Sequence, residues 1–182
     1  FLSHNLKLSP GSVVVATQEG SRPLLAELQA LTTRTVFAQP RRTTTGVDFQ
    51  RLVLVAAVIS KRLGIPLTSQ DILINVAGGL HISEPAADLG MAMAMLSSFY
   101  NSPCEPFSVI IGEIGLGGEV RPVPNLERRI NEANRLGFKR AIIPATQGPI
   151  KYKGQLETIP VNTIKEAVGK ALLEKQSYEI TG

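Results

Sequence analysis

His81, Ser83 and Asp88 are the residues of this chain most suited to catalysis, because together they are the three side-chain types of a Ser-His-Asp triad. They lie just before and at the start of a long apolar run. His81 and Ser83, however, alternate along a segment that reads as extended, and their spacing does not fix a hydrogen bond between them. We therefore interpret His81 as a solvent-facing side chain beside a turn.

Other common sites are not encoded either. His4 and His81 lie far apart and Cys104 is the single cysteine, so the sequence predicts no Cys/His metal site and no internal disulfide. The glycine-rich stretch GEIGLGG at residues 112–118 departs from a dinucleotide fingerprint, because a strand rather than a helix is predicted after it. No phosphate-binding loop of the form GxxxxGK[ST] occurs. We expect no cofactor and no metal in this chain.

Composition indicates one globular domain. The chain has 182 residues, of which 43% are hydrophobic and 19% charged, with a net charge of +4. This mild positive charge suits a solvated surface as well as a nucleic-acid partner. No charge-free apolar run reaches the roughly 18–20 residues of a membrane span, so we expect no membrane partner. The missing initiator Met and signal peptide, with the single cysteine, suggest a cytoplasmic fragment of a longer protein.

Hydrophobic patterns predict strands first and then alternating helices and strands. The strands are expected at residues 12–16, 22–33, 36–45, 71–77, 108–114, 119–123 and 141–144, and the helices at 47–63, 84–100, from 124–125 onward, and 163–173. This order indicates an α+β (mixed α/β) domain with one mixed sheet and helices mainly on one face. We place the domain at residues 11–175, between an N-terminal arm at 1–10 and a tail at 176–182.

The expected helix that follows Glu84 is the central element. Pro85 suits its first turn, where a backbone N–H would have no partner in the helix. Ala86, Gly90 and Ala94 recur every four residues and form a small-residue face, while the rest of the helix is apolar nearly all round, so it should be buried. Its N-terminus presents N–H groups and the positive end of the helix dipole, which suits an active site.

Two long motifs around this helix resemble the Lon-type protease family. They are GGLHISEPAADLGMAMAMLSSF at residues 78–99 and GEIGLGGEVRPVPNLERRINEANRLGFKRAIIP at residues 112–144. Within that family the chain is most similar to the Lon-like C-terminal domain of bacterial RadA (Sms) recombination proteins. The likeness extends upstream through GSRPLLAELQAL and QPRRTTTGVDFQRL, so it covers almost the whole chain.

The resemblance implies a lost catalytic dyad. Lon proteases use a Ser near the start of this helix and a Lys that takes its proton, and the chemistry needs both groups. The family pattern G-P-S-A-G falls on residues 84–88 and places Ala86 at the serine position. The pattern G-G-L-K falls on residues 124–127 and places Glu127 at the lysine position. We therefore expect no peptidase activity; residual activity through Ser83 is the alternative.

The RadA resemblance also implies a role and partners. It implies a hexameric ring beneath an ATPase ring, DNA binding without sequence preference during the processing of branched recombination intermediates, and contacts of the full-length chain with recombinase and replication-fork proteins. ATP with Mg²⁺ and zinc would belong only to missing N-terminal modules. The location would be cytoplasmic and nucleoid-associated, or a plastid or mitochondrion in a eukaryote. The alternative is a purely structural oligomerisation domain that does not contact DNA.

Arginines at the ends of predicted elements are the candidates for DNA contact, because a guanidinium presents a planar fork of donors to phosphate. They are Arg22, Arg41, Arg42, Arg51 and Arg121. His81 lies where RadA-like sequences carry a lysine, so it would bind phosphate well only when protonated. The alternative is that each charge is solvated or paired with Glu27, Asp48 or Glu119. A second basic group, namely Arg128, Arg129, Lys139 and Arg140, is predicted to be a solvated face.

Overall fold

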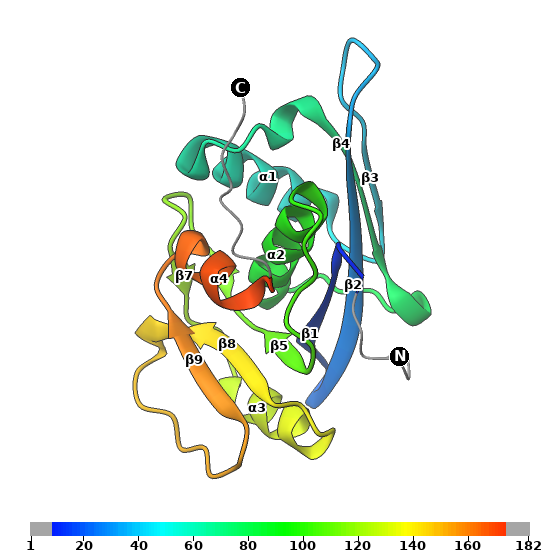
Figure 1. Ribbon diagram of the computed structural model, residues 1–182. Helices are drawn as coiled ribbons and strands as arrows, with labels where there is room; N and C mark the ends of the chain where they lie inside the picture. Colours follow the sequence, from blue (N-terminus) through cyan, green and yellow to red (C-terminus); the bar gives the residue numbers. More distant parts are fainter. Residues whose placement is uncertain (1–8, 174–182) are drawn as a thin grey trace.

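A seven-stranded mixed sheet runs through the part of the chain that the computed structural model describes, residues 9–173. Its strands are β1 (Ser12–Glu19), β2 (Arg22–Arg34), β3 (Arg42–Thr45), β4 (Gln70–Val76), β5 (Ser108–Ile110), β8 (Arg140–Pro144) and β9 (Glu157–Val161). They lie in the order β3-β4-β2-β1-β5-β8-β9 (Figure 1). Strand β2 is antiparallel to both of its neighbours, and the other adjacent pairs are parallel. The predicted α+β class with a mixed sheet is confirmed.

Helices cover the sheet unequally. Helices α1 (Phe49–Leu63), α2 (Asp88–Phe99) and α4 (Ile164–Ala171) pack against one face and share a core with Val13 and Val15. Helix α3 (Leu126–Arg135) packs on the other face with Val14 and Ala16. Successive residues of a strand point to opposite faces, so β1 is buried on both sides. The predicted packing of helices mainly on one face is confirmed.

The ends of α1 follow from its sequence. The Asp48 side chain accepts hydrogen bonds from the backbone N–H groups of Gln50 and Arg51, so it caps the helix rather than lying inside its first turn. Gly64 ends the helix in the left-handed conformation, with φ of 69°, as expected for a C-terminal cap. Most of the predicted N-terminal arm and the whole C-terminal tail lie outside the described residues. No helix within residues 9–173 is both long and apolar enough to cross a membrane.

Three strand predictions were wrong. The strand expected at residues 36–45 is confined to Arg42–Thr45, because an exposed loop containing Pro40 precedes it. The strand expected at 108–114 ends at Ile110, and β6 (Glu113–Ile114) pairs instead with β7 (Val120–Arg121) in a separate two-stranded sheet. Strand β9 was missed altogether, since it is short and contains Pro160, which suits a sheet edge.

Hydrogen bonds to α2 explain the break after Ile110. The Gly112 N–H donates to the Ala86 carbonyl at 3.0 Å, and the Gly112 carbonyl accepts from the Leu89 N–H at 3.0 Å. An added Cβ at Gly112 would lie 2.8 Å from Cγ1 of Val120. The chain therefore leaves the sheet at a glycine in order to bond the first turn of α2.

Gly90 sets the distance between α2 and the sheet. A Cβ built on Gly90 would lie 2.1 Å from Cγ1 of Val15 in β1. Val15 is fully buried and, as a β-branched residue, has few alternative rotamers in a strand. The small residue predicted at this position therefore allows α2 to lie directly against β1.

We expect Gly90→Ala to lower the free energy of unfolding by about 1–2 kcal/mol, because overpacking at Val15 outweighs the better helix propensity of alanine. Urea unfolding monitored by circular dichroism measures this change. The control is Gly169→Ala in α4, where nothing lies within 4 Å of an added Cβ. That variant should gain up to about 1 kcal/mol. Equal stability of the two variants would contradict the role of Gly90.

Candidate functional site

Ala86 lies immediately before α2, in the 3-10 turn Pro85–Ala87. It is 3% exposed and belongs to the same core cluster as Leu126 and Ile130 of α3. A methyl group therefore occupies the position that the family pattern gives to the catalytic serine. It is packed in the core and has no atom that can attack a carbonyl carbon.

Glu127 lies in the first turn of α3, where a carboxylate is favoured by the helix dipole. Its Oε1 accepts a hydrogen bond of 2.7 Å from the backbone N–H of Lys151. The position that the family pattern gives to the catalytic lysine thus holds a carboxylate. This carboxylate binds the loop between β8 and β9. Asn125, which stands at a glycine of that pattern, keeps a left-handed backbone with φ of 57°, a conformation that asparagine tolerates better than most residues.

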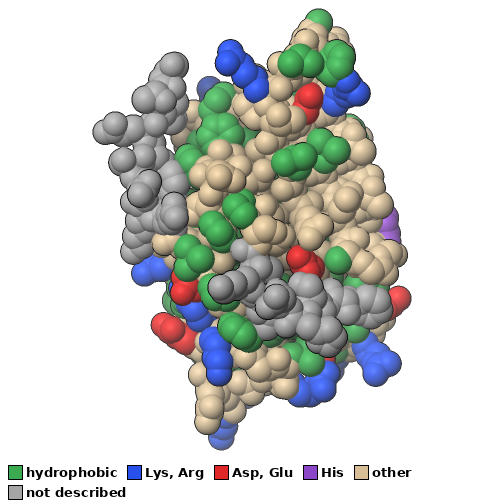
Figure 2. Space-filling view, turned by 45° about the vertical axis from the view of Figure 1, so that its right-hand side comes forward, with side chains coloured by type: hydrophobic (Ala, Val, Ile, Leu, Met, Phe, Trp, Pro, Cys, Tyr) green, Lys and Arg blue, Asp and Glu red, His purple; other side chains and the backbone are tan. Residues whose placement is uncertain are grey.

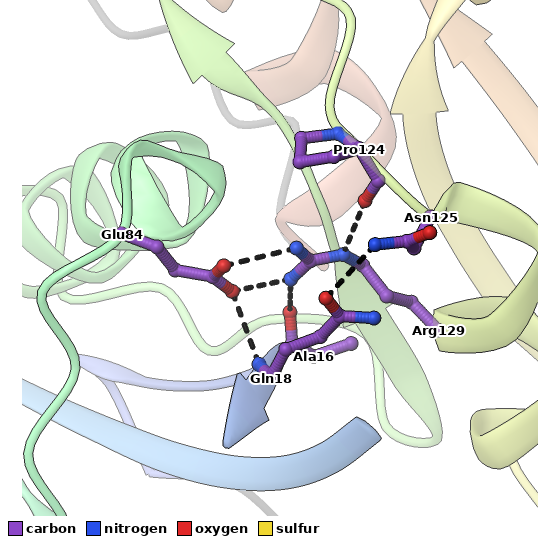
Figure 3. Close-up of polar contacts among 6 residues, drawn as sticks. All are labelled: Ala16, Gln18, Glu84, Pro124, Asn125 and Arg129. Carbon is purple, nitrogen blue, oxygen red and sulfur yellow. Dashed lines mark hydrogen bonds and ion pairs between the residues drawn. The ribbon is translucent and has the colours of Figure 1, made fainter. Parts of the chain in front are cut away.

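A buried arginine joins α3 to the start of α2 (Figure 3). The Arg129 side chain is 0% exposed and forms an ion pair with Glu84, with Nη2 donating to Oε2 at 3.0 Å. Its remaining donors bind the Ala16 carbonyl at 2.7 Å and the Pro124 carbonyl at 3.0 Å. Glu84 in turn accepts from the Gln18 N–H at 3.2 Å. One guanidinium therefore connects β1, α2 and α3.

The pKa of Glu84 reflects two opposing effects. Burial raises it, but the hydrogen bonds and positive charge of Arg129, together with hydrogen bonds from Thr17 and Gln18, outweigh burial, so the pKa lies below its ordinary value. A carboxyl group whose pKa is lowered on folding stabilises the fold above its ordinary pKa. That contribution is lost as the pH falls through the lowered value. The ion pair therefore stabilises the fold throughout the neutral range.

A second ion pair ties α2 to α1. The Asp88 side chain is 0% exposed, and its two oxygens accept from Nε of Arg51, at 3.1 Å, and from Nη2 of the same residue. The Ile114 N–H, from β6, donates to Oδ2 of Asp88 at 3.1 Å. Burial raises the pKa of Asp88 against the pull of Arg51 and of the Ile114 N–H, and the bond to Asp88 raises the pKa of Arg51. Together the two carboxylates hold α2 from both sides.

These contacts do not assemble a nucleophile and a base. Asp88 is bound to Arg51, while His81 and Ser83 are exposed, so the possible triad is not formed. The interpretation of His81 as solvent-facing is confirmed. Cys104 is buried, and burial raises the pKa of its thiol to about 12, so it is not a thiolate at neutral pH.

The start of α2 is not part of a dinucleotide loop, of a metal site within residues 9–173 or of the cavity between α1 and α4. The turn at residues 115–118 leads into β7 rather than into a helix, so it is a tight turn and not a dinucleotide loop. Within residues 9–173 no group of three His, Cys, Asp or Glu side chains could hold a metal ion, and His4 lies outside that range. A cavity of about 370 Å³ lies between α1 and α4, lined by Leu63, Tyr100 and Val168 among others, and includes neither Ala86 nor Glu127.

The candidate DNA-binding arginines do not form one patch. Arg22 begins β2, whereas Arg41 and Arg42 lie near its far end. At about 3.3 Å per residue, the 13 residues of β2 separate these ends by roughly 40 Å. Arg22 and Arg41 are exposed, as is His81. The structure therefore separates Arg22 from Arg41 and Arg42.

Several of these arginines already have partners within the chain. Arg42 donates to the carbonyls of Leu67, at 3.1 Å, and Gln70, and burial lowers its pKa. Arg51 is paired with Asp88, and Arg121 lies 3.0 Å from Glu119 in an exposed ion pair. Pairing of Arg121 with Glu119 was one of the expected alternatives to DNA contact. The DNA-binding role of the whole set stays a prediction.

The prediction of a solvated face was wrong for Arg129. Arg128 and Lys139 are exposed, but Arg129 is fully buried, and Arg140 is half-buried with Nη2 donating to the Lys170 carbonyl at 2.9 Å. The signal was present in the sequence, because Arg129 follows Leu126 by three residues and so lies on the apolar stripe of α3. Likewise, Asp88 at the start of a helix predicted to be buried required a partner of opposite charge.

The sequence of this chain matches one family model and several known proteins. The family model described as subunit ChlI of Mg-chelatase matches residues 42–147, more than half of the chain. Proteins named DNA repair protein RadA are 48% identical over 172 residues in Synechocystis sp., 51% over 169 in Halalkalibacterium halodurans and 44% over 171 in Streptococcus pneumoniae. These matches cover 94%, 92% and 93% of this chain but only 34%, 37% and 41% of the relatives. The chain thus spans little more than a third of their length.

We expect Arg129→Met to lower the free energy of unfolding by about 3 kcal/mol, because it leaves the Glu84 carboxylate without its partner in a mostly buried site. The double variant Glu84→Gln/Arg129→Met should recover part of this loss. Arg128→Met, at the exposed neighbouring position of the same helix, is the control and should change stability by less than about 0.5 kcal/mol. Urea unfolding at pH 7 compares them. If Arg129→Met proved as stable as Arg128→Met, the buried pair would not hold α3 in place.

Proposed function

Because this chain belongs to the ChlI family, as a Lon-like domain of the RadA type, we propose that it assembles and positions a DNA repair ATPase without cutting peptide bonds. The observation that carries the proposal is the start of α2, where Ala86 replaces the serine and two ion pairs fix the surrounding elements. The identity of 44–51% to proteins named DNA repair protein RadA supports the cellular role.

The rest of the full-length protein supplies the chemistry in this proposal. The relatives are more than twice as long as this chain, which leaves room for an ATPase module that binds ATP with Mg²⁺ and for a zinc-binding segment. This domain forms a hexameric ring beneath that ATPase and works in the cytoplasm, at the nucleoid. Recombinase and replication-fork proteins are partners of the full-length chain.

A part of one sheet face that no helix within residues 9–173 covers supports assembly. On β2 and β4, Leu28, Ala30, Ile72 and Ile74 are buried against the helices, so the residues between them point to the opposite side. There Leu31 is 56% exposed and Leu73 is 42% exposed, and the two are paired in register. Their exposed neighbours on β2, β3 and β4 are Gln29, Thr43, Thr45 and Asn75. Figure 2 shows few charged side chains over this broad side of the molecule, as is usual for the centre of a protein–protein interface.

DNA binding is the second part of the proposal. Arg22 and Arg41 are exposed guanidinium groups, and a ring would repeat them in every subunit and add up their fields. The internal partners of Arg42 and Arg51 favour the rival in which the domain only assembles the protein. DNA affinity and oligomeric mass measured on the same preparation distinguish a domain that binds DNA from one that only assembles the protein.

We expect no peptidase activity. Casein and fluorogenic peptides should be cleaved no faster with this chain than in buffer, because no hydroxyl or thiol in the site is activated by a base. An active Lon protease assayed in parallel is the positive control. Turnover by this chain that Ser83→Ala abolished would show that the exposed serine substitutes for the missing one.

We expect the chain to bind fluorescent duplex DNA with an affinity that falls steeply as salt rises. Arg22→Ala/Arg41→Ala should weaken binding several-fold and reduce the slope of log K against log salt by about 1–2, since up to two phosphate contacts are lost. Arg128→Ala, which removes an exposed charge from α3, is the control for net charge. If the wild-type chain forms a ring by light scattering but binds no DNA, the assembly-only function holds instead.

A further inference from the structure

The loop between β2 and β3 presents an exposed aromatic ring among arginines. Val36 is 88% exposed and Phe37 is 50% exposed, although both side chains are apolar. Figure 1 shows this loop projecting beyond the end of the sheet, away from the helices. Large apolar side chains at such a tip contribute nothing to the core of this chain. Two adjacent exposed apolar side chains make this tip a candidate contact site for another molecule.

Hydrogen bonds anchor the base of this loop. The Arg41 N–H donates to Oδ1 of Asp71 at 2.7 Å, and the Phe37 N–H donates to Oγ1 of Thr35 at 3.1 Å. The Arg42 guanidinium binds the Leu67 carbonyl below it. Because the two ends of the loop continue β2 and β3, the ring is presented from a fixed support rather than from a long linker.

The charges around the ring are arranged for an anionic partner. The guanidinium carbon of Arg41 lies 3.8 Å from the centroid of the Phe37 ring, a cation–π contact that orients both side chains. Arg34, at the end of β2, is also exposed. Asp71 is the carboxylate beside them, and it already accepts the Arg41 N–H. Figure 2 shows hydrophobic side chains at the top of the molecule with basic side chains on either side.

We propose that residues 34–41 form a stacking finger for unpaired DNA bases: Phe37 stacks on one base while Arg34 and Arg41 bind the flanking phosphates. The finger rests on the proposed DNA-binding function and adds to it the class of DNA that is held. A single strand offers both a base face and phosphates, which match an aromatic ring between guanidinium groups. Duplex DNA offers its phosphates but keeps its base faces stacked, so the ring gains nothing there.

A protein partner fits this tip less well. An apolar pocket could take Val36 and Phe37, but it would also desolvate the guanidinium groups beside them, and burying unpaired charge is costly. Phosphates remove that cost by pairing with the same groups. The base would stack on the face of the ring that Arg41 does not cover.

The test compares a 20-nucleotide single strand with the duplex of the same sequence, both fluorescently labelled, using this chain at one salt concentration. Phe37→Ser should weaken binding to the single strand about tenfold, as expected for the loss of one stacked base, and binding to the duplex by less than about twofold. Phe37→Tyr should restore single-strand affinity. Leu136→Ser, which removes an exposed apolar side chain from the end of α3, is the matched control.

A 2-aminopurine base placed in the single strand reports stacking directly, because its fluorescence falls when it stacks on a ring. The wild-type chain and Phe37→Tyr should quench it more than Phe37→Ser does. Three results would overturn the finger. If Phe37→Ser bound both DNAs like the wild type, the finger would fail while the proposed DNA binding stood. If no DNA bound at all, both would fail. If Phe37→Ser changed only the oligomeric mass, the tip would be a subunit contact.

Discussion

Two carboxylates at the beginning of a buried helix control how the layers of this domain fit together. Glu84 and Asp88 flank the 3-10 turn Pro85–Ala87 that leads into α2. A charge in such a position is tolerated only when it is paired and hydrogen-bonded. Arg129 comes from α3 on one face of the sheet, and Arg51 comes from α1 on the other. Each pair therefore fixes a helix on its own side relative to the same turn of α2.

The same turn is where a Lon-type protease would attack its substrate. Catalysis there needs a serine hydroxyl next to a lysine whose pKa is lowered by its surroundings, so that the lysine can accept the proton. In this chain the serine position is packed into the core, and the neighbouring charges are fixed in ion pairs. These ion pairs join α1 and α3 to the start of α2.

Arginines of this chain have different roles that only their surroundings distinguish. Arg129 binds two backbone carbonyls and a carboxylate inside the protein, and Arg42 binds carbonyls at the edge of the sheet. Arg41 instead lies against the exposed ring of Phe37. Because a guanidinium has five donors and is always charged, it serves equally well as an internal brace and as a contact for phosphate. Burial decides between the two roles.

Local sequence determined the helices and the residue that stands at the serine position of the family pattern. The helix expected at residues 47–63 and the buried helix expected after Pro85 both formed, and Ala86 placed no hydroxyl at the position of the family's serine. These follow from capping, periodicity and residue type, which act over a few neighbours. Tertiary structure alone decided that Gly112 leaves the sheet to bond α2, and that Arg129 pairs with Glu84, 45 residues away. Partners so distant in the chain are chosen by how the helices pack on the two faces of the sheet, and no local pattern records that choice.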